Sequence, residues 1–416
     1  MRSKGPGQVT GLLREVRDFY IKVSRDFNGL AFGANESAER IAEAVDLVRQ
    51  GLVQVVTGED YLNPHIRPWQ SQRTVESQVA SLGHGGGCLY PTPAGMKSVR
   101  LPERFKGRPY EQKLAKGRGV LELAYFTPDV LEFYRNDPRY YCRIGDFSVY
   151  MSVNDDTYGD EGEPEKDKVS LPHMGFAYDL SRYDRDDESS PILRRVAAFV
   201  GDLARLTPEH QQRWKTYQVP DGDLSPHPEW FANQMGHWTD GIGPFGRMFL
   251  ELEQINELFV NVASARLFAV DKAPDEYGWI LRPAQRDWDD FIRETDKLLS
   301  ENLRHAAFDA LEIDDKDEQG QKLGTIKRLE LLMEWSQVPT DAIARYLKPL
   351  REVRKARQKP AHTLRTNLSD KTLVHRQVNL MRDINQSLVN IAGWLSQHPS
   401  NRDYEFKDKG LEDFRM

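Results

Sequence analysis

Several features that mark whole classes of protein are missing from this chain of 416 residues. It has only two cysteines, Cys88 and Cys142, which argues against a disulfide framework and is too few for a closed zinc site. We therefore expect the reducing environment of the cytoplasm. No stretch approaches about 18 consecutive apolar residues, and the N-terminal MRSKGPGQVTGLLREVRDFY has no apolar core. We expect neither contact with a membrane nor a signal peptide.

The usual signatures of cofactor and nucleotide chemistry are also absent. Walker A and G-x-G-x-x-G patterns do not occur, which argues against a nucleotide-driven motor. Gly83-His-Gly-Gly-Gly87 resembles the oxyanion loop of some esterases, but without a G-x-S-x-G elbow we interpret it as a turn before a strand. His227 and His237 lack a nearby second pair of ligands, so we predict no metal site and no cofactor.

Positive charge is not in excess, since the net charge is −7. This argues against a protein that coats nucleic acid through bulk positive charge. A chain of this net charge can still carry a local basic patch. Apolar residues make up 39% and charged residues 29% of the chain, as in an ordinary soluble globular protein. At roughly 100 to 200 residues per domain, the length predicts two or three domains.

The distribution of helical and alternating patterns predicts a multi-domain α+β protein. We expect N-terminal helices, a β-containing middle region and a C-terminal all-α antiparallel helical bundle. The expected parts are a helical segment over 1–60, a β-containing region over 61–183, a helical and irregular connection over 184–283, the bundle over 284–398 and a charged tail over 399–416. We expect the tail to be frayed.

Individual elements follow from periodicity and capping residues. Two helices are predicted within 8–60, the second capped by Ser37. Further helices are predicted over 127–134, 192–206, 207–214 and 245–270, with Thr207 as a cap followed by Pro208. Strands are predicted over 120–126 and 147–153. The acidic run 154–168 is typical of a solvated loop.

The last part of the chain has the clearest pattern. Four helical segments follow one another with short breaks, over 284–311, 320–337, 340–359 and 369–397. Short connections between amphipathic helices predict antiparallel neighbours. The last segment has a near-heptad apolar stripe formed by Val374, Val378, Met381, Leu388, Ile391 and Leu395.

The stretch RQKPAH, residues 357–362, closes a basic run at the end of the third of these helices. Arg357 and His362 form an R-x4-H spacing, which occurs a second time at Arg205 and His210. We interpret the second pair as structural, because the residues inside it start a helix. The first pair differs in having a polar residue, Gln358, after the arginine. It also lies among other cations, namely Arg351, Arg354, Lys355, Lys359 and Arg365.

An R-[polar]-x3-H motif late in a helical bundle resembles the HEPN domains, which are often metal-independent RNases of prokaryotic toxin, CRISPR and anti-phage systems. The resemblance covers residues 284–398, and glutamine stands where asparagine is commonest in the family. It implies an endoribonuclease of a defence or toxin-like system. It also implies a homodimer formed through the bundle, with an arginine and a histidine from each subunit. A regulatory partner or ligand is expected at residues 1–283.

The residue types suit RNA cleavage without a metal. In this interpretation His362 is the general acid or base, and Arg357 holds the phosphate. Gln358 orients the pair, while Arg354, Lys355, Lys359 and Arg365 guide the RNA backbone. Positions i and i+5 of a helix point about 140° apart, so a break at Pro360 is needed to bring Arg357 and His362 together.

Two other interpretations fit the same residues. Cations near a helix end and a proline beyond it are ordinary features, so the basic run also fits a solvated helix end. The bundle would then be a non-catalytic, dimerising interaction or regulatory module. A module that binds RNA without cleaving it is the remaining alternative.

Overall fold

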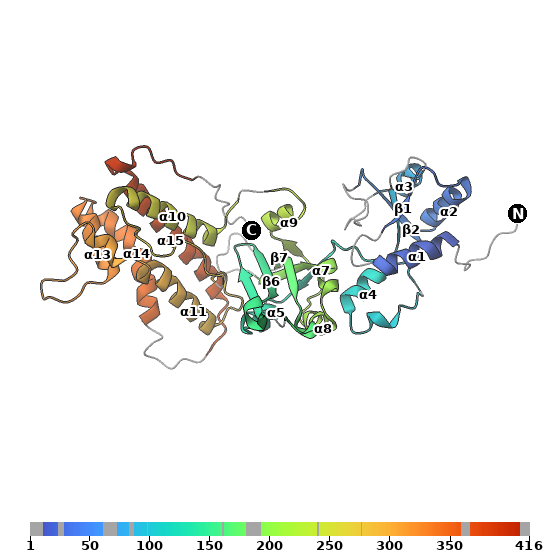
Figure 1. Ribbon diagram of the computed structural model, residues 1–416, viewed down its shortest axis with the longest axis horizontal. Helices are drawn as coiled ribbons and strands as arrows, with labels where there is room; N and C mark the ends of the chain where they lie inside the picture. Colours follow the sequence, from blue (N-terminus) through green and yellow to red (C-terminus); the bar gives the residue numbers. More distant parts are fainter. Residues whose placement is uncertain are drawn as a thin grey trace. The chain divides into compact units, whose positions relative to one another are not determined.

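The computed structural model describes residues 11–23, 29–60, 73–82, 87–97, 99–159, 162–179, 193–238, 241–275, 277–358 and 367–407. The protein is mixed α/β, with antiparallel sheets and a helical C-terminal region (Figure 1). It divides into two compact units. Unit 1 comprises residues 1–141, 150–177 and 195–222, and unit 2 comprises residues 142–149, 178–194 and 223–416. No helix within the described ranges combines the length and apolarity needed to cross a bilayer.

Unit 1 begins with a small sheet that carries three helices. Its strands are β1 Leu30–Phe32, β2 Val53–Thr57 and β3 Gly87–Pro91, with β3 between the other two and antiparallel to both. The helices are α1 Gly11–Val23, α2 Ala38–Arg49 and α3 Val75–Ser81. Their apolar faces form one core with the sheet, which includes Leu13, Val16, Leu47, Val55 and Leu89.

The two helices predicted within 8–60 are confirmed as α1 and α2. Ser37 caps α2, since its side chain accepts a hydrogen bond from the backbone N–H of Arg40 at 3.2 Å. The strands β1 and β2 were not predicted. They are three and five residues long, and β2 is buried on both faces, so neither shows a clear apolar–polar alternation.

A six-stranded sheet follows, whose main path runs β4-β8-β7-β6-β5. The strands are β4 Leu123–Phe126, β5 Tyr140–Ile144, β6 Ser148–Val153, β7 Ser170–Asp179, β8 Leu193–Phe199 and β9 Leu224–Pro226. The strands predicted over 120–126 and 147–153 are confirmed as β4 and β6. The short helix predicted between them is α5 Asp129–Arg135, which follows Pro128.

The prediction of one helix over 192–206 is wrong. Residues 193–199 form β8, which pairs antiparallel with β4, and only Val200–Arg205 is helical, as α7. Four consecutive residues of β8, Val196 to Phe199, are buried. A strand covered on both faces gives a continuous apolar run that periodicity does not separate from a buried helix.

Several shorter helices accompany these strands in the chain. They are α4 Pro109–Ala115, α8 Pro208–Thr216, α9 Pro228–Gln234 and the 3-10 helix Glu103–Phe105. Helix α8 confirms the prediction for 207–214, because Thr207 caps it and Pro208 occupies its first turn. The turn predicted at Gly83–Gly87 lies mostly outside the described residues, and Gly87 begins β3.

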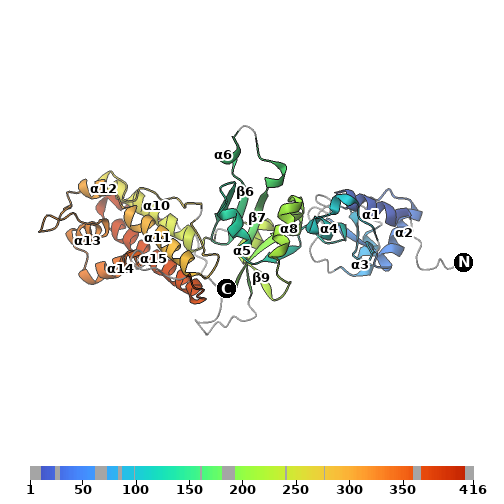
Figure 2. The ribbon, with the colours of Figure 1, turned by 90° about the horizontal axis from the view of Figure 1, so that it is seen from below.

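The acidic run 154–168 is more ordered than predicted. Asn154 caps the short helix α6 Asp155–Tyr158, which Figure 2 shows beyond the end of β6. Asp167, in the 3-10 helix Glu165–Asp167, is buried and accepts hydrogen bonds from Arg139 at 2.9 Å and from the Tyr158 hydroxyl at 3.2 Å. These contacts attach the C-terminal end of the run to the fold. The run is therefore not a fully solvated loop.

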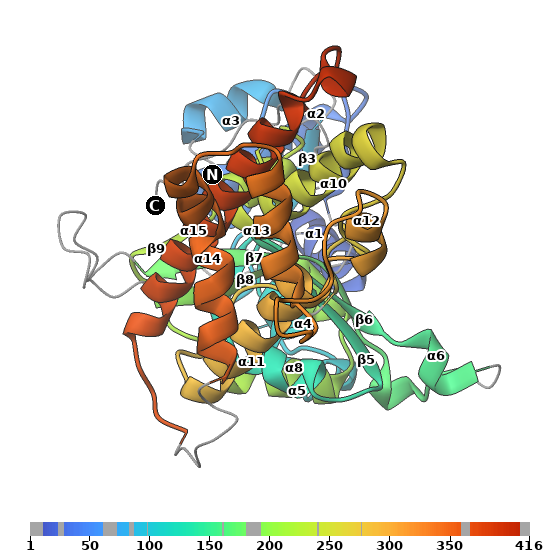
Figure 3. The same cartoon turned by 90° about the vertical axis from the view of Figure 1, so that its left-hand side faces the viewer.

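Most of unit 2 is helical. Its long helices are α10 Pro244–Ala263, α11 Gln285–Asp296, α13 Thr325–Trp335, α14 Thr340–Gln358 and α15 Thr372–Ser396, and the short helix α12 His305–Asp309 lies between α11 and α13 in the chain. Helix α14 packs against α11, α13 and α15, and Figure 3 shows α13 and α14 side by side. The predicted segment 284–311 is interrupted by a π-helix, η4 Lys297–Glu301, and by an extended residue before α12. The apolar stripe of α15 is buried as expected, except that Val378 is half-buried.

Helix α10, which lies upstream of the predicted bundle, packs along α15. It ends at Ala263, where the C-cap residue Ser264 has a φ of 53° in the left-handed region, so it is shorter than the predicted 245–270. The tail is not frayed over 399–407. Tyr404 donates to Glu257 of α10 at 2.7 Å, and the backbone N–H of Lys407 donates to Gln254 at 2.8 Å. Residues 408–416 lie outside the described part of the chain.

Candidate functional site

The basic residues of α14 lie on a helix that spans Thr340–Gln358 and continues through an internal proline, Pro349. Arg351, Arg354 and Arg357 are spaced by three residues, which places them near one face of the helix. All three contact carboxylates. Arg351 pairs with Glu330 of α13 at 2.8 Å, whereas Arg354 and Arg357 turn toward the end of α11.

Asp296, the last residue of α11, is the centre of this contact. Its side chain is 0% exposed, and its Oδ2 accepts from Nη1 of Arg354 at 3.0 Å and from Nη1 of Arg357 at 2.6 Å. Its Oδ1 accepts from the Ser300 hydroxyl at 2.7 Å. A carboxylate without access to water must be paired and hydrogen-bonded, so the two arginines are its counter-ions.

A second carboxylate, Glu301, contacts the same two arginines. It accepts a hydrogen bond from Nη1 of Arg357 and lies 3.8 Å from Nη1 of Arg354. Its side chain is 46% exposed, in contrast to Asp296. The pKa of Arg357 is raised above its ordinary value, first by the hydrogen bond to Asp296 and then by the one to Glu301. Arg357 therefore remains a cation at any working pH.

The π-helix η4 explains how both carboxylates reach α14. Asp296 and Glu301 are five residues apart, and in a regular α-helix such positions point about 140° apart. A π-helix is wider and pairs residue i with residue i+5, so this spacing comes closer to one face. The insertion of η4 between α11 and α12 thus turns Asp296 and Glu301 toward the same arginine pair.

We name Arg354, Arg357, Asp296 and Glu301 the α14 cluster. The other predicted site residues are not part of it in the described structure. Lys355 and Gln358 are exposed, and the orienting role of Gln358 stays a prediction. Lys359, Pro360, His362 and Arg365 lie outside the described residues, so the approach of His362 to Arg357 also stays a prediction. Helix α14 is described as far as Gln358, and the predicted boundary at Lys359 lies outside the described residues.

Sequence reasoning identified the two arginines but missed both acids. A signal for Asp296 is present, since it follows Ile292 by four residues and precedes Leu299 by three, and both of these are buried. A carboxylate on the apolar stripe of a helix needs a cation. Glu301 gives no comparable signal, because its position on that side depends on η4.

The structure supports the structural interpretation of the second R-x4-H pair, Arg205 and His210. His210 is buried, and its Nδ1 lies 2.9 Å from the Tyr134 hydroxyl. Its backbone N–H donates to the Thr207 cap of α8. Burial lowers the pKa of His210 below its ordinary value, so the ring is neutral near pH 7. Its ring packs against the rings of Tyr134 and Tyr140.

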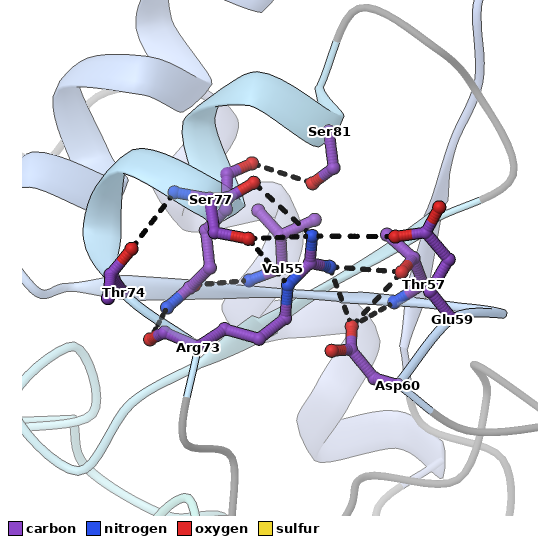
Figure 4. A network of polar contacts seen from close by, with 9 residues as sticks. Val55, Thr57, Glu59, Asp60, Arg73, Thr74, Ser77 and Ser81 are labelled. Atoms are coloured by element: carbon purple, nitrogen blue, oxygen red, sulfur yellow. Dashed lines mark hydrogen bonds and ion pairs between the residues drawn. The ribbon is translucent and has the colours of Figure 1, made fainter.

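Unit 1 contains an arginine cluster of another kind (Figure 4). Arg73 precedes α3 and donates through Nη1 to Asp60 at 2.8 Å and to Thr57 at 3.0 Å. Its Nε and Nη2 both donate to Ser77, at 3.2 and 3.1 Å. The network joins the end of β2 to the first turn of α3 and encloses the guanidinium, so we interpret it as structural.

Near the α14 cluster, a surface groove of about 260 Å³ opens between α11, α14 and α15. Its lining includes the apolar Ile292, Val353 and Leu380 and the charged Glu352, Arg376 and Asp383. Arg376 lies over the ring of Trp288, 4.7 Å from its centroid.

Comparison of the chain with protein-family models, with curated proteins and with solved structures gives no match.

Proposed function

We propose that the C-terminal bundle is a HEPN-type domain that acts as a metal-independent endoribonuclease. The observation that carries the proposal is the convergence of Arg354 and Arg357, from successive turns of α14, on carboxylate oxygens. Arginine pairs that hold carboxylates also suit phosphates, because both anions accept hydrogen bonds from the guanidinium fork. In the sequence, His362 follows Gln358, the last described residue of α14, by four positions.

The mechanism assigns one task to each side chain. A base removes the proton from a ribose 2′-OH, and the resulting oxygen attacks the neighbouring phosphorus while the 5′-oxygen leaves with a proton. His362 is suited to either proton transfer, because its ordinary pKa lies near neutrality. Arg357 would balance the charge that builds on the phosphate oxygens. DNA lacks the 2′-OH, so the reaction selects RNA.

We further propose that the site is completed in a homodimer formed through the bundle. Arg354, Lys355, Lys359 and Arg365 would guide the RNA backbone toward it. The role of residues 1–283 in this proposal is regulatory, through a partner or ligand that controls the enzyme.

The test compares RNA with DNA of matched sequence. The full-length protein should cleave RNA only, and Arg357→Ala and His362→Ala should each abolish cleavage while circular dichroism stays unchanged. Matched controls are Arg205→Ala, an exposed arginine of the other R-x4-H pair, and His173→Ala, an exposed histidine of β7. Both controls should cleave at the wild-type rate. Cleavage that survives the changes at Arg357 and His362 overturns the site assignment.

One observation favours a second candidate, a non-catalytic interaction module. Both contacts of Arg357 to described residues go to carboxylates, and one of these is fully buried, as expected of a structural counter-ion. In this case the dimer forms without RNA cleavage. Analytical ultracentrifugation together with the cleavage assay separates the candidates. A third outcome, RNA binding without cleavage, identifies a binding module.

A further inference from the structure

The two acids of the α14 cluster differ in how firmly the fold holds them. Asp296 has no exposed surface and accepts hydrogen bonds from Arg354, Arg357 and Ser300. Glu301 is 46% exposed, and its contacts among described residues are to the two arginines. A half-exposed side chain with water beside it can leave at low cost, whereas a buried carboxylate cannot. Asp296 is thus a fixed part of the cluster, and Glu301 is replaceable.

The charges of the cluster support this distinction. Arg354 and Arg357 carry two positive charges, and Asp296 and Glu301 together carry two negative charges. With Glu301 withdrawn, Asp296 still neutralises one arginine, and one positive charge remains. A single phosphodiester carries one negative charge and would restore neutrality.

The donors of the arginines leave room for such a ligand. Arg354 and Arg357 both contact Asp296 through Nη1, and Arg357 also contacts Glu301 through Nη1. Within the described residues, neither arginine uses Nε or Nη2 in a hydrogen bond. An arginine has five N–H donors in a fork, so an anion at the position of Glu301 can receive further hydrogen bonds.

We propose that Glu301 is an internal stand-in for an RNA phosphate. It closes an anion site formed by Arg354 and Arg357, and a phosphodiester takes its place while Asp296 keeps both arginines in position. The proposal rests on the proposed function for the identity of the ligand, since RNA is the anion named there. It adds a competing side chain within the chain itself, which lowers RNA affinity until it is displaced.

The experiment measures binding of a 2′-O-methyl RNA 12-mer to the full-length protein, because this RNA has no free 2′-OH and is not cleaved by the proposed route. Glu301→Gln should lower Kd about fivefold, the scale of one partly exposed ion pair. Glu294→Gln is the matched control. Glu294 is 45% exposed and contacts Arg293 and Lys297 instead of the two arginines. This control should change Kd by less than about twofold.

The salt dependence of Kd gives a second measurement. Wild type and Glu301→Gln place the same phosphodiester against the two arginines, so their slopes of log K against log salt should agree. Adding Arg354→Ala to Glu301→Gln leaves Arg357 balanced by Asp296, which should remove the tighter binding and make the slope shallower by about 0.7 for a single strand. Unchanged or weaker binding by Glu301→Gln, an unchanged slope on adding Arg354→Ala, or no binding by either protein overturns the stand-in role.

Binding of the 2′-O-methyl RNA and cleavage of ordinary RNA test the stand-in role and the RNase activity separately. If Glu301→Gln binds no better than wild type, yet ordinary RNA is cleaved in a manner that needs Arg357 and His362, the RNase proposal stands and the stand-in role is wrong. If Glu301→Gln binds the 2′-O-methyl RNA more tightly and ordinary RNA is never cleaved, the anion site stands and the RNase proposal is wrong.

Discussion

Arg73 in unit 1 and Arg357 in unit 2 each lie between two carboxylates, but they use their donors differently. Arg73 is 16% exposed, and its Nε, Nη1 and Nη2 all donate to side chains of the fold. Arg357 is 33% exposed and, among the described residues, donates through Nη1 alone. The first guanidinium is saturated by its surroundings. The second is more exposed and has donors that no described residue uses.

The difference separates a cross-link from a site. A saturated arginine contributes to stability, and a ligand would have to break existing hydrogen bonds to reach it. An arginine that is anchored by a buried acid and still has spare donors is held in position for an anion. The presence of an ion pair therefore says little about function, whereas the number of donors left over is informative.

The largest expected effect comes from removing both arginines of the α14 cluster. The double change Arg354→Ala and Arg357→Ala leaves Asp296 buried without a counter-ion, which should cost about 3 to 5 kcal/mol. Adding Asp296→Asn should recover most of this loss. Because the chain has two units, hydrogen exchange of α11 and α14 is the suitable measurement.

A matched control on the same helix is Arg351→Ala, whose partner Glu330 is partly exposed. It should cost no more than about 1 kcal/mol. If the double change at Arg354 and Arg357 costs as little as this control, the anchoring role assigned to Asp296 is wrong.

When a single arginine is removed, the larger loss of stability should occur at Arg73 and not in the α14 cluster. Arg73→Ala removes all the donors that Asp60, Thr57 and Ser77 receive from it and should cost about 2 to 3 kcal/mol, seen as faster exchange in β2 and α3. Arg357→Ala should cost about 1 kcal/mol, because Arg354 still pairs with Asp296. Arg40→Ala, which breaks partly exposed pairs to Glu15 and Glu36, is the control for unit 1 and should stay below about 1 kcal/mol. Equal costs for Arg73→Ala and Arg357→Ala would remove the distinction between the clusters.

The sequence predicted the long helices better than the site. Helices α14 and α15 were located closely, because their apolar residues recur at helical spacing over many turns. β8 was mistaken for a helix, and β1 was missed, because a buried or very short strand has no clear period. Arg354 and Arg357 were identified from local spacing. Their acidic partners lie between 53 and 61 residues earlier in the chain, and a π-helix that no local pattern announces brings both into reach.

Neutralising one acid in each cluster should have a smaller effect in the same direction. Asp60 accepts from the backbone N–H and hydroxyl of Thr57 and from Arg73, so Asp60→Asn should cost about 1.5 to 3 kcal/mol in exchange of β2. Glu301→Gln should cost less than about 1 kcal/mol in exchange of α14, because the side chain is half exposed. A cost for Glu301→Gln that matches Asp60→Asn would mean that Glu301 is structural and not replaceable.

The smallest effect is the response of these two variants to salt. The Debye length falls from about 10 Å at 0.1 M to about 3 Å at 1 M, and this screens exposed pairs far more than enclosed ones. At 1 M NaCl the stability difference between Glu301→Gln and wild type should therefore shrink to within a few tenths of a kcal/mol. The difference for Asp60→Asn should persist, because hydrogen bonds to Thr57 and Arg73 inside the fold remain lost whatever the salt concentration. Hydrogen exchange of α14 and β2 at both concentrations measures this contrast. A salt response of equal size in both variants would place Asp60 and Glu301 in the same electrostatic environment, and the two arginines would then differ only in their number of neighbours.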